Sequence, residues 1–269
     1  MTHEMKLREA PFVAMRDGKK DIELRLYDEK RSKLCLGDYI IFTCSEREER
    51  VCVIIKGLHR YPDFQALFAD LPKKRLGYDE EEAASPDDLL AYYTAEDIKR
   101  YGVLGIEIAL QREPHAVVDI YSKGDYPADL LSNFAPHAFV LDGVACASME
   151  GFLQALKHKS PEKQREICSL TGKAAKMAGK GKHLFKLTGH LYWQGKKLHR
   201  RRKEYNALVR RAYEAMLAAS EDFKLALLCT QDRPLTHSLG KHSRFTTILT
   251  ETEFIEHLNA VRRLLHREQ

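Results

Sequence analysis

The 269-residue sequence lacks any uninterrupted apolar run long enough to span a bilayer. Its first residues, MTHEMKLREAPF, mix acidic and basic side chains before any apolar stretch, which is not the pattern of a secretory signal. Cysteine is sparse, and the six cysteines are scattered without a C-x-x-C pair. We therefore predict a cytoplasmic protein with reduced core cysteines and no membrane partner, rather than a disulfide scaffold or a structural zinc protein.

Metal-binding and nucleotide-binding motifs are also poorly represented. His183, His190 and His199 lack the i, i+4 spacing with a nearby acid that a catalytic zinc helix needs. The segment Thr171–Ala174 contains the Gly-Lys pair of a P-loop, but it lacks the upstream glycine and the Ser or Thr that would bind magnesium. We expect no metal, no cofactor and no ATPase or kinase activity.

The composition that remains is that of a folded globular protein, with 44% hydrophobic and 31% charged residues. This length is comfortable for two domains of ordinary size. The second half carries the excess of positive charge, and its densest basic stretch runs from Lys173 to Lys203. Such a stretch is consistent with a solvated face, and equally with a surface that attracts phosphate or nucleic acid.

The first half begins with a short helix expected at residues 12–16, followed by the segment IELRL at residues 22–26. Strict alternation in this segment predicts a half-buried strand. The alternation places Glu23 and Arg25 on the face opposite the apolar residues, next to Lys20 at the strand entry. From spacing alone, Glu23 and Arg25 are also consistent with a surface ion pair.

The rest of the first half reads as strands interrupted by helices. Three more segments are expected to form strands: residues 38–43, 50–57 and 102–110. Helices are expected to begin near Asp63 and at Thr94, and the Thr94 hydroxyl with an acidic residue three positions on is the pattern of a helix cap. The acidic segment 79–88 is expected to be a surface loop leading into a short helix at Pro86. A small, mostly antiparallel barrel with helical insertions fits this pattern.

Gly18, Lys20, Glu23 and Arg25 match a G-x-K-x-x-E-x-R signature, and on these residues the first 112 residues resemble the ASCH domain. The resemblance implies a PUA-like barrel with a cleft for RNA or a modified nucleoside, in which Lys20, Glu23 and Arg25 face the ligand. Some members are amidohydrolases of acetylated cytidine that use a lysine, a threonine and a glutamate. Here Asp21 stands where a small hydroxyl residue is commoner.

The strongest helix signal in the second half begins at Ser148, which can cap the helix. Four apolar residues recur at i, i+3, i+4 and i+7: Met149, Phe152, Leu153 and Leu156. At roughly 100° per residue, Glu150, Gln154 and Lys157 share the polar edge beside this stripe. A rise of about 10.5 Å separates Glu150 from Lys157, which suits them to hold opposite ends of a small ligand. Two solvated charges on an amphipathic helix would show the same spacing.

Asn133-Phe134, the segment 148–150 and the segment 154–157 resemble, in composition and order, the NADAR, or YbiA-like, family. Segments 172–176 and 225–237 also fit that order. The resemblance implies a mostly α-helical domain that cleaves an N-glycosidic bond. We therefore expect an α+β protein with an ASCH-like domain at residues 1–112 and a NADAR-like domain at residues 118–269.

The substrate implied by this resemblance is an ADP-ribosylated base or a ribosylamino compound, free or in a modified nucleic acid. Glu150 can stabilise the positive charge that develops on the sugar or shuttle protons. Lys157, if desolvated, can attack the opened C1 aldehyde and form a Schiff base.

Substrate-binding roles are expected for further residues of the second half: Asn133, Phe134, Gln154, Trp193 and His237. Asn133 would orient sugar hydroxyls, and Phe134 or Trp193 would stack on a base. His237 lies in a late loop where many members carry a W-G-x-G segment. Two alternatives remain open: a non-catalytic protein that binds RNA or nucleotides, and an ASCH-type acetylcytidine amidohydrolase.

Overall fold

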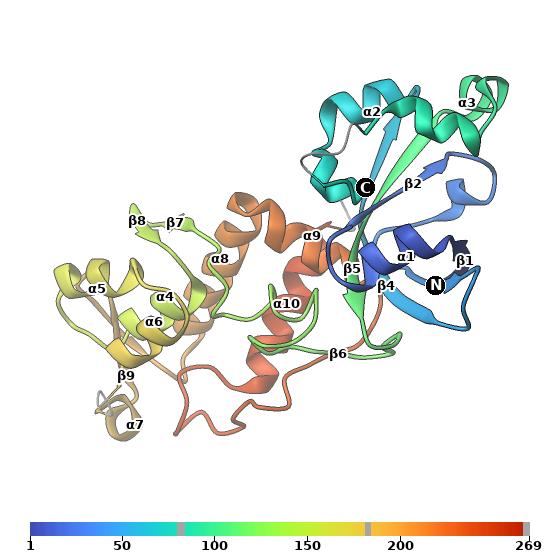
Figure 1. The fold of residues 1–269 in the computed structure, drawn as a ribbon. Coiled ribbons are helices and arrows are strands. Elements are labelled where there is room, and N and C mark those ends of the chain that lie inside the picture. Colours follow the sequence, from blue (N-terminus) through green and yellow to red (C-terminus); the bar gives the residue numbers. More distant parts are fainter. Residues whose placement is uncertain (80–83, 181–183, 266–269) are drawn as a thin grey trace. The chain divides into compact units, whose positions relative to one another are not determined.

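The computed structural model describes residues 1–79, 84–180 and 184–265. The chain forms two compact units, Met1–His115 and Ala116–Gln269, and its class is α+β as expected (Figure 1). The acidic segment 79–88 and the basic stretch from Lys173 to Lys203 are therefore described only in part. His183 lies outside the described residues.

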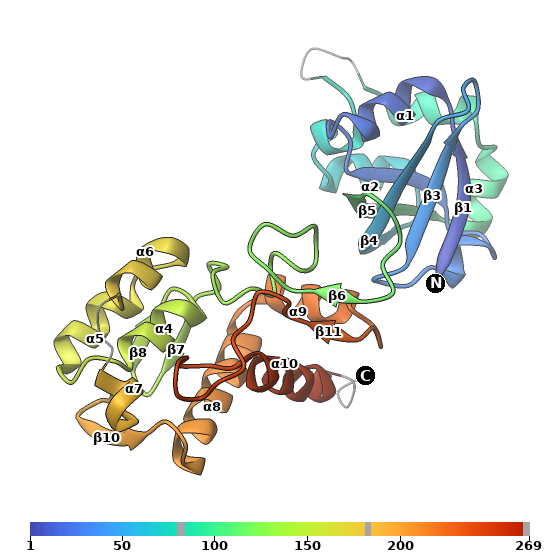
Figure 2. The same cartoon turned by 90° about the horizontal axis from the view of Figure 1, so that it is seen from below.

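The first unit is built on a five-stranded sheet that curls into a half-barrel (Figure 2). Its strand order is β1-β3-β4-β5-β2. The strands are β1 (Thr2–Leu7), β2 (Ile22–Leu26), β3 (Tyr39–Cys44), β4 (Arg50–Tyr61) and β5 (Val103–Gln111). Strand β1 pairs parallel with β3, and the other neighbours pair antiparallel. This confirms the expected barrel-like sheet and adds β1, which the sequence reading missed.

In the described part of the first unit, the helices expected near Asp63 and at Thr94 begin where predicted, whereas the helix expected at residues 12–16 begins three residues earlier, at Glu9, and has no side-chain cap. These helices are α1 (Glu9–Arg16), α2 (Phe64–Asp70) and α3 (Ala95–Tyr101), with three 3-10 turns, η1 (Arg31–Lys33), η2 (Lys73–Leu76) and η3 (Pro86–Ala91). Asp63 and Thr94 accept hydrogen bonds from backbone N–H groups three residues ahead. The short helix at Pro86 is confirmed, with Ser85 in a capping box.

The second unit is mostly helical. Its helices are α4 (Met149–Ala155), α5 (Pro161–Cys168), α6 (Gly172–Ala178), α7 (Leu184–Thr188), α8 (Lys203–Ala219), α9 (Glu221–Cys229) and α10 (Glu251–Leu265). Three strand pairs complete it: β6 (Val118–Asp119) with β11 (Leu235–Thr236), β7 (Phe139–Leu141) with β8 (Val144–Cys146), and β9 (His190–Trp193) with β10 (Lys196–His199). No helix in the described residues is long and apolar enough to cross a membrane.

Helix α4 is buried along its whole length. Ser148 caps it as predicted, accepting from the Gly151 N–H at 3.0 Å. The end of α5 and the turn that follows it approach so closely that a Cβ on Gly151 would lie 2.6 Å from the backbone oxygen of Leu170. The polar edge of α4 is therefore held at a fixed depth in the unit.

The six cysteines are free thiols with different environments. Cys44, Cys146, Cys168 and Cys229 are buried, as the core interpretation required. Cys35 is exposed, in the turn between η1 and β3, and Cys52 is half-buried. The expectation that all six are core residues is therefore wrong for Cys35. Apolar neighbours in the sequence do not determine whether a side chain in a turn points into the core or toward solvent.

Candidate functional site

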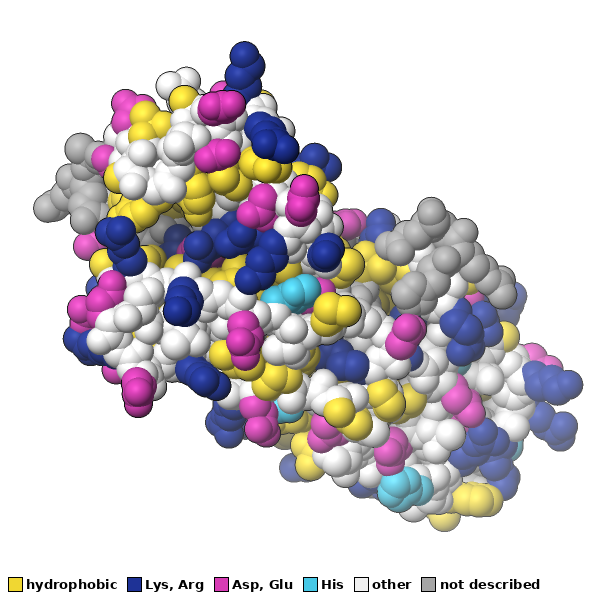
Figure 3. All heavy atoms as spheres, turned by 90° about the vertical axis from the view of Figure 1, so that its right-hand side faces the viewer, with side chains coloured by type: hydrophobic (Ala, Val, Ile, Leu, Met, Phe, Trp, Pro, Cys, Tyr) yellow, Lys and Arg dark blue, Asp and Glu magenta, His cyan; other side chains and the backbone are white. Residues whose placement is uncertain are grey.

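The first unit contains a pocket of about 520 Å³ between the β1-α1 segment and the η3 turn. Figure 3 shows lysine and arginine side chains gathered in a hollow of this unit. Basic and aromatic side chains stand out in the lining: Lys6, Arg8, Lys20, Arg25, Tyr78, Tyr92 and Tyr93. Flat rings beside fixed cations are what a base or nucleoside requires of its binding site.

The signature residues Lys20, Glu23 and Arg25 all reach this pocket. The Lys20 Nζ lies 3.4 Å from Glu23 Oε2, and the Arg25 Nη2 lies 3.0 Å from Glu23 Oε1. Lys20 also donates to the Leu76 carbonyl at 2.8 Å, and Arg25 donates to the Lys6 carbonyl at 2.8 Å. Glu23 is buried between two cations, so the interpretation as a surface ion pair does not describe it.

Burial dominates the electrostatics of Lys20. Desolvation lowers the pKa of its ammonium, and the neighbouring Glu23 acts in the opposite direction. Gly77, at φ +95°, packs against the Lys20 stem, where a Cβ would lie 3.1 Å from the Lys20 Cβ. The Arg25 Nε is buried without a hydrogen-bond partner among the described residues, so this guanidinium retains a donor beside the pocket.

The sequence reading missed the three tyrosines of the pocket, Tyr78, Tyr92 and Tyr93. Tyr92 and Tyr93 directly precede the Thr94 cap, and an aromatic pair before a helix cap is the signal that could have found them. Arg8 lies over the Tyr92 ring at 4.6 Å. No threonine stands among the pocket-lining residues that the structure describes.

Asp21, the departure from the ASCH pattern, is absent from the described pocket lining. Arg75 donates to both of its carboxylate oxygens and, at 2.8 Å, to Glu107. Glu107 also contacts His59 at 3.2 Å. The hydrogen bond from His59, together with the one from Arg75 and the charges of Lys56 and Arg75, outweighs burial and lowers the pKa of Glu107 to about 2. This cluster ties the η2 turn to the sheet, which gives Asp21 a structural role.

In the second unit, Glu150, Gln154 and Lys157 form a continuous hydrogen-bonded chain. The Gln154 Nε2 donates to Glu150 Oε1 at 2.9 Å, and the Lys157 ammonium donates to Gln154 Oε1. Glu150 is only 8% exposed. The three residues share an edge as predicted, but Lys157 lies beyond the end of α4 and reaches back to Gln154. Gln154 thus lies between Glu150 and Lys157, and the hypothesis that these two residues hold opposite ends of a ligand stays a prediction.

The two ends of this chain are shifted toward their neutral forms. Burial raises the pKa of Glu150, although the Gln154 hydrogen bond and the charges of Lys176 and Lys157 oppose the shift. Burial also lowers the pKa of Lys157, with Lys186 and Lys176 adding to the effect and Glu150 opposing it. A carboxyl and an amine with displaced pKa values, joined through one amide, are suited to proton transfer.

Asn133 and Phe134 lie beside this chain. The backbone N–H of Glu150 donates to the Asn133 carbonyl at 2.9 Å, and the Asn133 side chain accepts from the Tyr213 hydroxyl at 2.6 Å. The Lys176 Nζ lies 5.3 Å from the centre of the Phe134 ring. Tyr213 and Lys176 were not among the residues singled out from the sequence, because only the packing of α8 and α6 brings them here.

Trp193 and His237 have other surroundings. Trp193 is 4% exposed, packs edge-on against Phe152 at 5.1 Å and donates to Asp142 at 2.8 Å. Its indole is a core group, which corrects the expectation that it stacks on a base. His237 contacts the Ile120 carbonyl through Nδ1 at 2.6 Å and belongs to the late loop. No group of three His, Cys, Asp or Glu side chains in the described residues is placed to hold a metal ion.

The pKa shift of Glu150 can be tested through stability. Between pH 4.5, the ordinary pKa of a glutamate, and the raised pKa of Glu150, this carboxyl is protonated in the folded state but ionised in the unfolded state. Its contribution to the free energy of unfolding therefore falls as the pH rises from 4.5 through this range. We predict that Glu150→Gln gains stability relative to the unmodified chain as pH rises from about 4 toward 8, measured by urea unfolding. Glu166→Gln, at an exposed position of α5, is the control. A pH-independent difference would contradict the burial of an ionisable Glu150.

Two family models match the chain. Residues 5–111 match the model described as the ASCH domain, which confirms the resemblance based on Gly18, Lys20, Glu23 and Arg25. Residues 125–263 match the model described as bacteriophage protein GP30.3. The family model for the second unit is thus a phage family, whereas its motifs resembled NADAR.

Individual proteins are similar to parts of the chain. The chain is 37% identical to an uncharacterized 17.1 kDa protein of Enterobacteria phage T4, from the Gp30-rIII intergenic region, over 54% of this chain and 96% of that protein. The crystal structure of hypothetical protein PH0355 has 32% identity and a TM-score of 0.36, covering 41% of this chain and 100% of its own. The E. coli protein YbiA has 17% identity and a TM-score of 0.40, covering 56% of this chain and 86% of its own. Because the phage model spans more than half of the sequence, the chain belongs to the family of bacteriophage protein GP30.3.

Proposed function

We propose that the second unit is an N-glycosidase-type hydrolase that cleaves a bond between ribose and nitrogen in an ADP-ribosylated base or a ribosylamino compound. The observation that carries the proposal is the buried chain from Glu150 through Gln154 to Lys157, whose ends are shifted toward neutral forms. The resemblance of segments 133–134 and 148–157 to the NADAR pattern supports the substrate class.

Glu150 would act as the acid and then as the base. When the ribosyl C–N bond breaks, the bonding electrons leave with the nitrogen, which takes the carboxyl proton of Glu150. The sugar carbon becomes electron-deficient, and the Glu150 carboxylate stabilises it. Water then adds to this carbon, and its proton returns to Glu150. The raised pKa of Glu150 favours this cycle because it keeps the carboxyl protonated at higher pH than an exposed glutamate.

Lys157 offers a covalent variant of the same reaction. When the ribose ring opens, its oxygen takes a proton and C1 becomes double-bonded to the base nitrogen. The neutral amine of Lys157 would add to this C1 and displace the base nitrogen, which leaves with a proton as the free amine, so that a Schiff base between C1 and Lys157 remains and water later hydrolyses it. The lowered pKa of Lys157 raises the neutral fraction of the amine. Gln154, which hydrogen-bonds both residues, would hold the amine at a fixed distance from the carboxyl.

For the first unit we propose recognition of RNA or a modified nucleoside in the pocket of Lys20, Glu23 and Arg25. The paired tyrosines Tyr92 and Tyr93 would contact the base, and the Arg25 guanidinium would donate to a polar group of the ligand. Amidohydrolysis is less well supported than binding, because the described lining includes no threonine to complete the set that the resemblance implies.

Removing the charge of Glu150 should abolish most of the glycosidase activity. We expect Glu150→Gln to lower turnover at least about 100-fold, because the amide neither donates nor accepts the transferred proton. The measurement is release of the sugar product from ADP-ribosylated DNA or from a ribosylamino-pyrimidine phosphate. Glu166→Gln should retain full activity. Equal turnover in the Glu150 variant would remove this residue from the mechanism, and no product from the unmodified chain would favour the binding alternative.

The covalent variant can be trapped. If Lys157 forms a Schiff base, borohydride added during turnover should reduce it to a stable adduct that mass spectrometry maps to this lysine. Lys157→Arg should abolish the adduct, whereas Lys163→Arg, on the exposed face of α5, should leave it intact. An active enzyme that yields no adduct, or one mapped elsewhere, would assign the chemistry to Glu150 alone.

The pocket of the first unit can be tested with N4-acetylcytidine. We expect calorimetric titration of the full chain to show binding without release of acetate. Lys20→Met and Arg25→Gln should each weaken binding about tenfold, since each removes a charged partner of the buried site. Lys33→Met, at an exposed position, should leave the affinity unchanged. Acetate release would restore the amidohydrolase alternative, and unchanged affinity in both pocket variants would exclude this pocket.

A further inference from the structure

Two exposed segments of the second unit carry positive charge and one aromatic ring. They are residues 201–203 (Arg-Arg-Lys), after β10, and residues 241–246 (Lys-His-Ser-Arg-Phe-Thr), in the late loop. All nine side chains are exposed, and Phe245 is 58% exposed. We call these two segments the basic-aromatic surface. It shares no residue with the pocket of the first unit or with the chain from Glu150 to Lys157.

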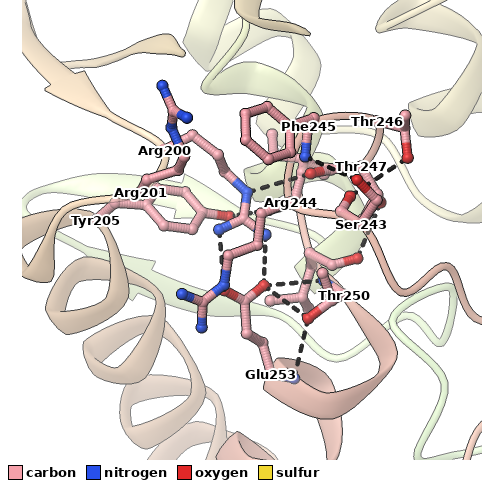
Figure 4. Close-up of polar contacts among 12 residues, drawn as sticks. Arg200, Arg201, Tyr205, Ser243, Arg244, Phe245, Thr246, Thr247, Thr250 and Glu253 are labelled. Atoms are coloured by element: carbon pink, nitrogen blue, oxygen red, sulfur yellow. Dashed lines mark hydrogen bonds and ion pairs between the residues drawn. The ribbon is translucent and has the colours of Figure 1, made fainter.

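A buried ion pair brings the two segments together. Arg200, next to the first segment, donates to the Thr247 carbonyl at 3.1 Å and binds Glu253 through both terminal nitrogens. The Arg244 Nε also forms an ion pair with Glu253 Oε1, at 2.9 Å (Figure 4). Segments about 40 residues apart in the sequence are thus attached to one carboxylate, and the loop is held from inside.

This attachment places a cation directly on the aromatic ring. The Arg201 guanidinium carbon lies 4.7 Å from the centre of the Phe245 ring. More than half of Phe245 remains exposed, although an apolar ring gains free energy when it is covered. The Phe245 ring is therefore held in place by its contact with Arg201 but remains exposed to solvent.

The local charge is strongly positive. Arg201, Arg202, Lys203, Lys241 and Arg244 contribute five basic side chains. The acidic residues nearby are few: Glu253 is neutralised by two arginines, Glu251 contacts His242 at 3.2 Å, and Glu204 is exposed. Cations around an exposed ring attract a polyanion whose flat groups can stack.

We propose that the basic-aromatic surface binds single-stranded nucleic acid, with a base stacked on Phe245 and phosphates contacted by Arg201, Arg244 and their neighbours. An acidic protein or an anionic membrane would use the charge but would not require a ring for stacking. The proposal does not depend on the glycosidase chemistry, because its measurement is binding in the absence of a cleavable substrate.

The test uses fluorescein-labelled dT12 and rU12 with the full chain, which distinguishes DNA from RNA as the source of the strand. Phe245→Ala should weaken binding about fivefold or more, the loss of one stacked base. Arg201→Gln should reduce the dependence of log affinity on log salt concentration by about 0.7, the loss of one phosphate contact.

Two matched controls remove similar groups elsewhere. Leu239→Ala deletes an exposed apolar side chain of the same loop, and Arg165→Gln deletes an arginine of α5 that is as exposed as Arg244. Both should bind like the unmodified chain, and thermal unfolding should confirm that all variants fold. Repeating the Phe245→Ala measurement in an Arg25→Gln background separates this surface from the first unit, and the same loss is expected there.

Three results would overturn the proposal. The first is unchanged affinity for both oligonucleotides in Phe245→Ala and Arg201→Gln. The second is equal binding of inorganic polyphosphate with no effect of Phe245→Ala, which would indicate charge attraction without stacking. The third is binding to phosphatidylserine vesicles together with no binding to either oligonucleotide.

Discussion

A charged side chain that leaves water must find a partner inside the protein, and the identity of that partner determines what the buried group can do. Glu150 and Glu253 illustrate this, since both are nearly buried in the same unit, at 8% and 5% exposure. Burial acts to raise both pKa values. At Glu253, bonds from Arg200 and Thr250 outweigh burial and lower the pKa, whereas at Glu150 the direct partner is the neutral amide of Gln154 and the pKa is raised. The Glu253 carboxylate is thus held as an anion that organises a loop. The Glu150 carboxyl, with a neutral partner, is suited to proton transfer.

The sequence predicted best those features that depend on neighbouring residues. The caps at Thr94 and Ser148 were located because a capping side chain acts within three residues of its own position. The polar edge formed by Glu150, Gln154 and Lys157 followed from helical geometry alone. The ASCH signature was found for the same reason, because its residues lie within one turn and one strand.

Features that depend on distant segments were not predicted. Strand β1 pairs with β3 across more than thirty residues, and neither its composition nor its length distinguished it beforehand. Trp193 was expected to stack on a base because it carries a large flat ring, but its partners Phe152 and Asp142 place it in the core. Glu253 caps the start of α10 together with Thr250, but its contact with Arg200 joins residues 53 positions apart, which no local pattern could show. The family of the second unit likewise emerged from its whole length rather than from short motifs.

The close approach of α6 to α4 has a consequence for how the site can vary. A Cβ at position 179 would lie 1.8 Å from the Gln154 Oε1, so any side chain there must displace the amide that connects Glu150 with Lys157. Gly179 has an ordinary negative φ, and its requirement for glycine is therefore one of space rather than of backbone conformation. Because this oxygen is the far end of a flexible side chain, Gln154 can move aside, but only by leaving its present position between Glu150 and Lys157. A larger residue at position 179 would therefore break the hydrogen-bonded connection between Glu150 and Lys157 without changing either of these two residues.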